Sequence, residues 1–357
     1  AVPGYPPHPQ MLAWLGEAGA SRANAGYGAI EGDAPLREIY AAELCAIYGG
    51  SVSADNVHIT AGCNEAFVTA VLCVAAPGES VLLTNPFYFN HETTLRMFGV
   101  RTELFACRAE TGFVPDPAAL DRALEGGARA VALVSPNNPT GAVYPPQVLA
   151  EIFAICRRRG VWLILDETYR DFIADVSRPP HALFEQPGWD ENLISLYSFS
   201  KSYCIPGHRA GAVTAGRDVV EAIAKVMDNL QICAPRPPQA ALVKAIPGLR
   251  DWREANRREI AARTDALRAV FDGLAGWELA AVGAYFGFVR HPFDGNPSME
   301  VAEKLATKAG VLTIPGTFFG PEQEGFLRFA FANADVPTIG ALRERLERFG
   351  SSFKARP

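Results

Sequence analysis

Seven short apolar runs, rich in β-branched residues, alternate with helix-like segments along the first 214 residues of the chain. Between the runs, segments such as 64–74 and 146–159 repeat apolar residues at the spacing of a helix. This alternation predicts a largely parallel sheet with both faces covered by helices. Binding residues are then expected at the carboxyl ends of the strands. The seven runs are 56–60, 80–84, 101–105, 129–134, 161–165, 193–197 and 210–214.

The pattern changes after Asp218. A long helical stretch, 254–271, is rich in arginine, glutamate and alanine, and shorter strand-like pieces follow at 285–290 and 326–331. We therefore predict an α/β fold. Its large domain has a mostly parallel seven-stranded sheet sandwiched by helices, and a smaller α+β domain accompanies it.

The domain boundaries follow from the same change. The large domain is expected to span residues 33–240, with the proline-rich segment 234–238 near its end. The small domain is expected to combine residues 1–32 with 241–357. With 357 residues, of which 49% are hydrophobic, the chain has enough apolar material for a sizeable core.

Charge and cysteine usage narrow the class of protein. The net charge of −6 gives no electrostatic reason to expect nucleic acid or an anionic membrane as a partner. The seven cysteines form no C-x-x-C pair, so a zinc site or a disulfide framework is not expected. Reduced thiols indicate a cytoplasmic protein. No apolar run has membrane-spanning length, and the first residues lack the features of a signal peptide.

Lys201 is the first candidate for chemistry. It ends the segment 198–201, directly after an apolar run, and Arg209 follows eight residues later. A lysine at a strand end can hold an aldehyde cofactor as a Schiff base while nearby hydroxyls and an arginine hold a phosphate. Most lysines are solvated surface residues, so the interpretation depends on the other segments.

The segment 60–66 joins the first predicted strand to a helix. Gly62 allows a tight turn, and the free N–H groups of the following helix start attract phosphate. The alternative is an ordinary helix cap by Asn64. Neither a Walker A loop nor the three glycines of a dinucleotide fingerprint is present.

Two further strand ends carry aromatic or amide side chains. Tyr88 lies in 85–89 and could stack on a flat ring, although packing is the commoner role of an aromatic residue. Asn138 lies in 135–141, where two prolines make a rigid turn that could require a cis peptide. Its amide could donate to a phenolate oxygen, or the segment could be only a stiff polar turn.

Asp166 and Arg328 complete the set. Asp166 ends an apolar run, and a carboxylate there would keep a pyridine nitrogen protonated, with Tyr169 in reach of the same ring. The alternatives are a metal or a ribose ligand. Arg328 stands alone in the apolar run 326–331, where it either binds a carboxylate in a cleft or faces solvent.

Taken in order along the chain, these segments resemble the class I/II aminotransferases of fold type I, which use pyridoxal 5′-phosphate. The resemblance covers residues 4 to about 350. It implies a homodimer with shared active sites, which acts on α-amino acids and 2-oxo acids. The motifs that carry it are AGCNEA at 61–66, NPFYF at 85–89, SPNNPTG at 135–141, DETY at 166–169, SFSK at 198–201 with Arg209, and FLRFAFA at 326–332.

The resemblance also implies a role for each candidate residue. Lys201, Asp166 and Tyr169 would be catalytic. Arg328, Asn138 and Gly4 would bind the substrate, with Arg328 on its α-carboxylate. The cofactor would be bound by Gly62, Cys63, Asn64, Tyr88, Asn138, Asp166, Tyr169, Ser198, Ser200, Lys201 and Arg209, with Tyr27 reaching the phosphate in the neighbouring subunit.

Three departures from the family pattern stand out. Cys63 replaces a smaller residue, so its contact is expected from the backbone. His208 has no assigned role, and the segment before Gly4 is shorter than usual, as if the N-terminal arm were truncated.

The predicted activity is transamination. A lyase or a decarboxylase with the same cofactor is the alternative. A non-enzymatic pyridoxal phosphate-binding regulatory module or a nucleotide-binding dehydrogenase fits less well. The motifs do not select the donor amino acid.

Overall fold

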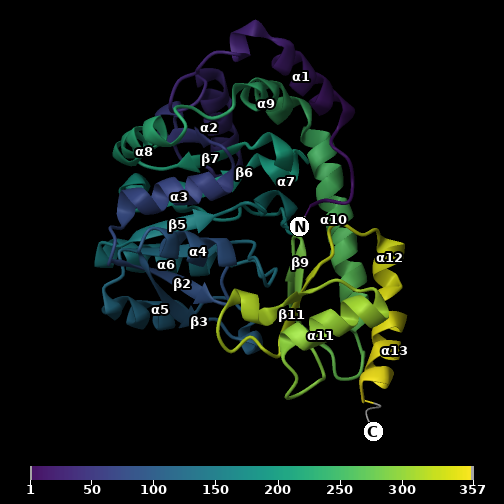
Figure 1. Ribbon diagram of the computed structural model, residues 1–357. Coiled ribbons are helices and arrows are strands. Elements are labelled where there is room, and N and C mark those ends of the chain that lie inside the picture. Colours follow the sequence, from purple (N-terminus) through teal and green to yellow (C-terminus); the bar gives the residue numbers. More distant parts are fainter. Residues whose placement is uncertain (1, 355–357) are drawn as a thin grey trace.

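The computed structural model describes residues 2–354, and its larger part is built on a seven-stranded sheet (Figure 1). The strands follow the order β1-β7-β6-β5-β4-β2-β3, in which β7 runs antiparallel to both of its neighbours and the remaining pairs are parallel. The predicted α/β fold with a mostly parallel seven-stranded sheet is therefore confirmed. The strands are β1 Val57–Thr60, β2 Ser80–Asn85, β3 Arg101–Ala106, β4 Ala130–Val134, β5 Trp162–Asp166, β6 Leu193–Ser198 and β7 Gly211–Thr214.

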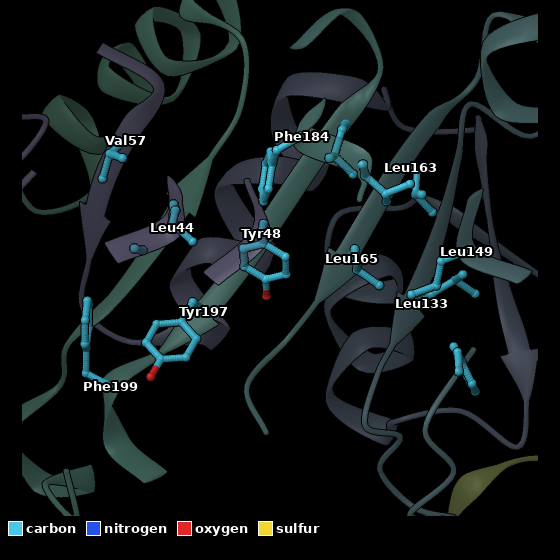
Figure 2. Close-up of a cluster of buried hydrophobic side chains, with 14 of the residues drawn as sticks. Leu44, Tyr48, Val57, Leu133, Leu149, Leu163, Leu165, Phe184, Tyr197 and Phe199 are labelled. Carbon is cyan, nitrogen blue, oxygen red and sulfur yellow. The ribbon is translucent and has the colours of Figure 1, made fainter. Parts of the chain in front are cut away.

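Helices cover both faces of this sheet, because the inner strands β2, β4, β5 and β6 send apolar side chains to both sides. In β5, Leu163 and Leu165 join one core with α2, α5, α6 and α9, and Ile164 joins the opposite core with α3, α4 and α8. Figure 2 shows part of the first core, in which Leu44, Leu163 and Leu165 lie on the same side of the sheet. These helices are α2 Ala34–Tyr48, α3 Cys63–Val74, α4 Phe89–Met97, α5 Pro117–Ala123, α6 Pro146–Arg159, α8 Arg217–Leu230 and α9 Arg236–Gly248.

A smaller antiparallel sheet follows, with strand order β10-β11-β9-β8. The long helix α10 packs Leu267, Val270 and Phe271 against it, and α13 adds Leu346 and Phe349 to the same core. In Figure 1, α10 runs from the larger sheet to this smaller unit. Its elements are α10 Arg250–Phe271, β8 Glu278–Gly283, β9 Phe286–Arg290, α11 Ser298–Lys304, β10 Ile314–Pro315, β11 Phe326–Ala330, α12 Val336–Gly340 and α13 Leu342–Lys354.

The N-terminal segment touches both units. Helix α1, Pro9–Ala20, packs against α9, whereas the backbone N–H of Gly4 donates to the carbonyl of Ala332 beyond β11 at 2.9 Å. The division of the chain at residues 32 and 240 stays a prediction. Within residues 2–354, no helix is long and apolar enough to cross a membrane.

Candidate active site

A cavity of about 160 Å³ lies at the carboxyl ends of β4, β5 and β6. Most of the residues singled out from the sequence line it together, although they come from segments far apart in the chain. Thr168 was not predicted and also lines it. The lining residues are Cys63, Asn64, Tyr88, Val134, Asn138, Asp166, Thr168, Tyr169, Ser198, Ser200, Lys201, Pro206 and Arg209.

The start of α3 forms one wall. Gly62 is the N-cap residue, with φ 91°, and the helix already begins at Cys63, so the alternative of a cap by Asn64 is excluded. A Cβ at position 62 would collide with Arg209 Nη2, which donates to the carbonyl of Ala61 at 2.9 Å. Only glycine lets this arginine lie against the helix start. The guanidinium of Arg209 and the start of the helix together create a region of positive potential where an anion can bind.

Lys201 lies on α7, a single turn from Phe199 to Ser202. Ser198 Oγ accepts from the backbone N–H of Ser200 at 3.3 Å and so caps this turn. The Ser200 hydroxyl is buried and has no hydrogen-bond partner among the described residues. Burial, and then the charge of Arg209, lower the pKa of Lys201, which increases the fraction of its amine that is unprotonated and able to accept a proton.

Asp166 is held by two groups from different parts of the chain. The backbone N–H of Thr168 donates to Oδ1 at 2.9 Å, and His91 Nε2 lies 3.4 Å from Oδ2. Burial alone raises the pKa of Asp166, but His91 and Thr168 outweigh it and hold the pKa below its ordinary value. The carboxylate is therefore ionised at neutral pH.

His91 is a site residue that the sequence analysis missed. Its ring stacks on Phe67 of α3 at a centroid distance of 3.8 Å, which fixes it beside Asp166. The available signal was its place three residues after Tyr88, since residues three apart at a helix start lie on the same side.

Arg328 reaches the site from β11 of the smaller sheet. Its Nη1 donates to Asn138 Oδ1 at 2.8 Å, and its guanidinium lies 4.8 Å and 5.0 Å from the ring centres of Phe286 and Phe319. The residue is only 7% exposed, and Nε has no hydrogen-bond partner among the described residues. The alternative of an arginine on the solvent side of the strand is excluded. Because Asn138 accepts through its oxygen, its amide nitrogen keeps its donors for another group.

Two tyrosines complete the walls. Asn90 donates to Tyr88 Oη at 2.7 Å, which fixes the ring of Tyr88. Tyr169 is buried against Tyr285, and burial raises its pKa, so its hydroxyl stays protonated and can donate. The predicted rigid turn beside Asn138 has cis peptide bonds before Pro136 and Pro139, which confirms that expectation.

Gly4 and Tyr27 lie outside this cavity. A Cβ on Gly4 would be 2.7 Å from the carbonyl oxygen of Asn333, so the chain passes close to the segment after β11. Tyr27 is 78% exposed and does not contact the cavity of its own chain. Burial, and then the charge of Asp166, raise the pKa of the Cys63 thiol.

Comparisons with known proteins agree with this arrangement. Residues 5–346 match the family model described as aminotransferase class I and II. An aromatic aminotransferase of Arabidopsis thaliana is 28% identical over 329 residues, covering 90% of this chain and 81% of the relative. An LL-diaminopimelate aminotransferase of Moorella thermoacetica is 30% identical over 324 residues, covering 90% and 82%. The solved aromatic aminotransferase from Pyrococcus horikoshii superposes with a TM-score of 0.92 at 26% identity, covering 99% of this chain and 95% of that one. The chain therefore belongs to the class I and II aminotransferase family, whose members move an amino group between an amino acid and a 2-oxo acid.

Proposed function

We propose that this chain transfers the amino group of an α-amino acid to a 2-oxo acid with pyridoxal 5′-phosphate, which Lys201 holds covalently through Nζ. One observation carries the proposal. Lys201, Asp166 and Arg209 line a single cavity, and Arg328 reaches Asn138 at its edge. A basic amine, a buried carboxylate and two guanidinium groups are what this chemistry requires.

The residues of the cavity fit the parts of the cofactor. Arg209, the start of α3 and the Ser200 hydroxyl, which no described residue binds, suit a phosphate. Asp166 suits a protonated ring nitrogen. Asn138 and Tyr169 suit the 3′ oxygen, and Tyr88 suits the ring face. Bound there, pyridoxal 5′-phosphate would supply the electron sink for the bond that breaks at the substrate's Cα.

The protein's own residues would then handle binding and the proton. Arg328 would take the α-carboxylate through two parallel hydrogen bonds, since its Nε has no partner within residues 2–354. Once the substrate's amino group has taken its place on the cofactor, Lys201 Nζ would be a primary amine again and, with its lowered pKa, would remove the proton from the substrate's Cα and later return one. The ionised Asp166, with His91 beside it, would keep a positive charge on the group that it faces.

We further propose a homodimer in the cytoplasm. The exposed Tyr27 supports the dimer, because a tyrosine that does not contact its own cavity is available to a partner's phosphate. The seven unpaired cysteines support a reducing compartment. Within the chain we propose a large domain of residues 33–240 and a small domain of residues 1–32 with 241–357, with the Gly4 backbone near the substrate.

Reductive trapping tests the proposal directly. Borohydride treatment of the purified protein, followed by peptide mass mapping, should find a pyridoxyl group on Lys201. A pyridoxyl group on Lys225 or Lys244 instead would overturn the assignment.

A donor screen should follow. Relatives are named for arginine, aspartate, aromatic and diaminopimelate substrates, so a broad panel is needed. A 2-oxo acid product supports transamination, whereas released ammonia, thiol or carbon dioxide would favour a lyase or decarboxylase.

A further inference from the structure

A second cluster of charged groups lies next to the turn that carries Lys201 and is not part of the cavity. Its centre is Asp171, whose Oδ2 accepts from Tyr197 Oη at 2.6 Å and from Ser202 Oγ at 2.5 Å. Arg253 Nη1 contacts the other oxygen, Oδ1, at 3.3 Å. One carboxylate thus joins the end of β6, the end of α7 and the helix α10.

Ser202 is the residue next to Lys201 and the last residue of α7. A four-residue helix has too few internal hydrogen bonds to be rigid by itself. Its start is capped by Ser198, and its end is held by the bond from Ser202 to Asp171. The position of the Lys201 backbone therefore depends on contacts at both ends of the turn.

Arg253 connects this turn to the smaller unit. Its Nη2 also binds Glu43 at 2.6 Å, so the side chain is fixed on two carboxylates. Ten residues further along α10, Arg263 Nη1 donates to the carbonyl of Ala332, which follows β11. In Figure 1, α10 runs beside both sheets. A displacement of α10 would therefore move both the Lys201 turn and the segment after Arg328.

We infer that Asp171 is a positioning residue for Lys201, which holds the Lys201 turn in register with α10 and hence with the strand that carries Arg328. The inference rests on the proposed role of Lys201. It adds a residue pair, Asp171 and Ser202, that does not line the cavity.

The charge of Asp171 suits this task. Burial alone raises its pKa, but Arg253, Arg170, Ser202 and Tyr197 outweigh burial and hold the pKa below its ordinary value. The carboxylate is therefore ionised at neutral pH and accepts strong, charge-assisted hydrogen bonds. An amide in its place would keep the shape and lose the charge.

The test uses Asp171→Asn and Ser202→Ala, with Ser202→Thr as the conservative variant that keeps the hydroxyl. Asp175→Asn is the matched control, because Asp175 lies four residues on and, among the described residues, its carboxylate pairs only with Ser177 and, at 3.7 Å, Arg178. The measured quantity is the midpoint of the absorbance titration of the lysine-bound cofactor, together with kcat and KM. A role confined to fold stability would lower Tm and leave this midpoint in place.

We expect Asp171→Asn and Ser202→Ala to shift the midpoint by about half a pH unit or more. A displaced turn should also lower kcat by about ten- to hundredfold with a smaller change in KM. Ser202→Thr should recover most of both, and Asp175→Asn should match the wild type. Unchanged midpoints and kcat in Asp171→Asn and Ser202→Ala would overturn the inference. Absence of a pyridoxyl group on Lys201 in the wild type would instead overturn the proposed function.

Discussion

Two neighbouring carboxylates at the end of β5 lie in contrasting environments. Asp166 faces the cavity, whereas Glu167 points to the opposite face of the sheet, because successive side chains of a strand alternate. On that face, Glu167 Oε1 accepts from Tyr48 Oη at 2.5 Å and Oε2 accepts from Ser195 Oγ at 2.8 Å. His181 Nε2 lies 3.2 Å from Oε1. We call Glu167, Tyr48, Ser195 and His181 the back cluster.

The oxygen atoms of the back cluster all have partners within the chain. The backbone N–H of Leu183 donates to His181 Nδ1 at 3.2 Å, whereas His181 Nε2 lies close to Glu167 Oε1 without forming a hydrogen bond with it. On the cavity side, by contrast, the Ser200 hydroxyl and Arg328 Nε have no partner among the described residues. The difference teaches where a ligand belongs: a buried polar group without a partner is costly, and a bound molecule removes that cost.

The largest expected effect is on turnover, and it distinguishes Asp166 from Glu167. Asp166→Asn keeps the shape but removes the charge that stabilises a protonated ring, so turnover should fall on the order of a thousandfold or more. Some cofactor should remain bound. Steady-state kinetics of Asp166→Asn and of Glu167→Gln measure this difference in turnover. Near-normal turnover in Asp166→Asn would show that Asp166 does not hold the ring.

A substitution of Arg328, which reaches the cavity from the smaller sheet, tests the cavity side of this comparison. Arg328→Lys keeps the charge but loses the two-pronged geometry, which should lower kcat/KM for amino acids by about thirtyfold to several thousandfold, or roughly 2–5 kcal/mol. Cofactor spectra should barely change, and amines without a carboxylate should be affected far less. Arg290→Lys is the matched control, since Arg290 lies on the adjacent strand and pairs with Glu278. Equal losses for amines and amino acids would make Arg328 a structural residue.

The strands could be predicted because their signals are local. Even the small errors have local causes: the run 161–165 becomes β5 one residue later, because the N–H of Val161 donates to Cys156 and closes the end of α6. His91 and the back cluster could not be predicted in the same way. His91 meets Asp166 only after α4 packs across the sheet, and Tyr48 lies 119 residues from Glu167. Contacts of this kind depend on tertiary packing and leave no periodic pattern in the sequence.

A substitution in the back cluster should lower the free energy of unfolding. Glu167→Gln leaves Tyr48 and Ser195 competing for one neutral amide oxygen and removes the negative charge beside His181. We expect a loss of about 1–3 kcal/mol in the free energy of unfolding. Urea unfolding followed by circular dichroism measures this loss, and Glu185→Gln, on the exposed side of a nearby turn, is the control. A stability equal to that of the wild type would mean that the back cluster is replaceable.

The smallest effect is the pH dependence of that stability difference, and its sign is fixed by the back cluster. Burial alone raises the pKa of Glu167, but His181, Arg170 and Tyr48 outweigh burial and hold the pKa below its ordinary value. A carboxylate whose pKa is lower in the folded state stabilises the fold fully above its unfolded-state pKa of about 4.3. That contribution is lost as the pH falls through the lower, folded-state pKa.

The advantage of the wild type over Glu167→Gln should therefore be constant above about pH 5. Below about pH 4.3 it should shrink, by at most about 1.4 kcal/mol for each pH unit. Urea unfolding of both proteins between pH 3 and pH 6 measures the trend. An advantage that grows as the pH falls would mean that burial has outweighed the donors and that Glu167 takes up its proton more readily in the folded state.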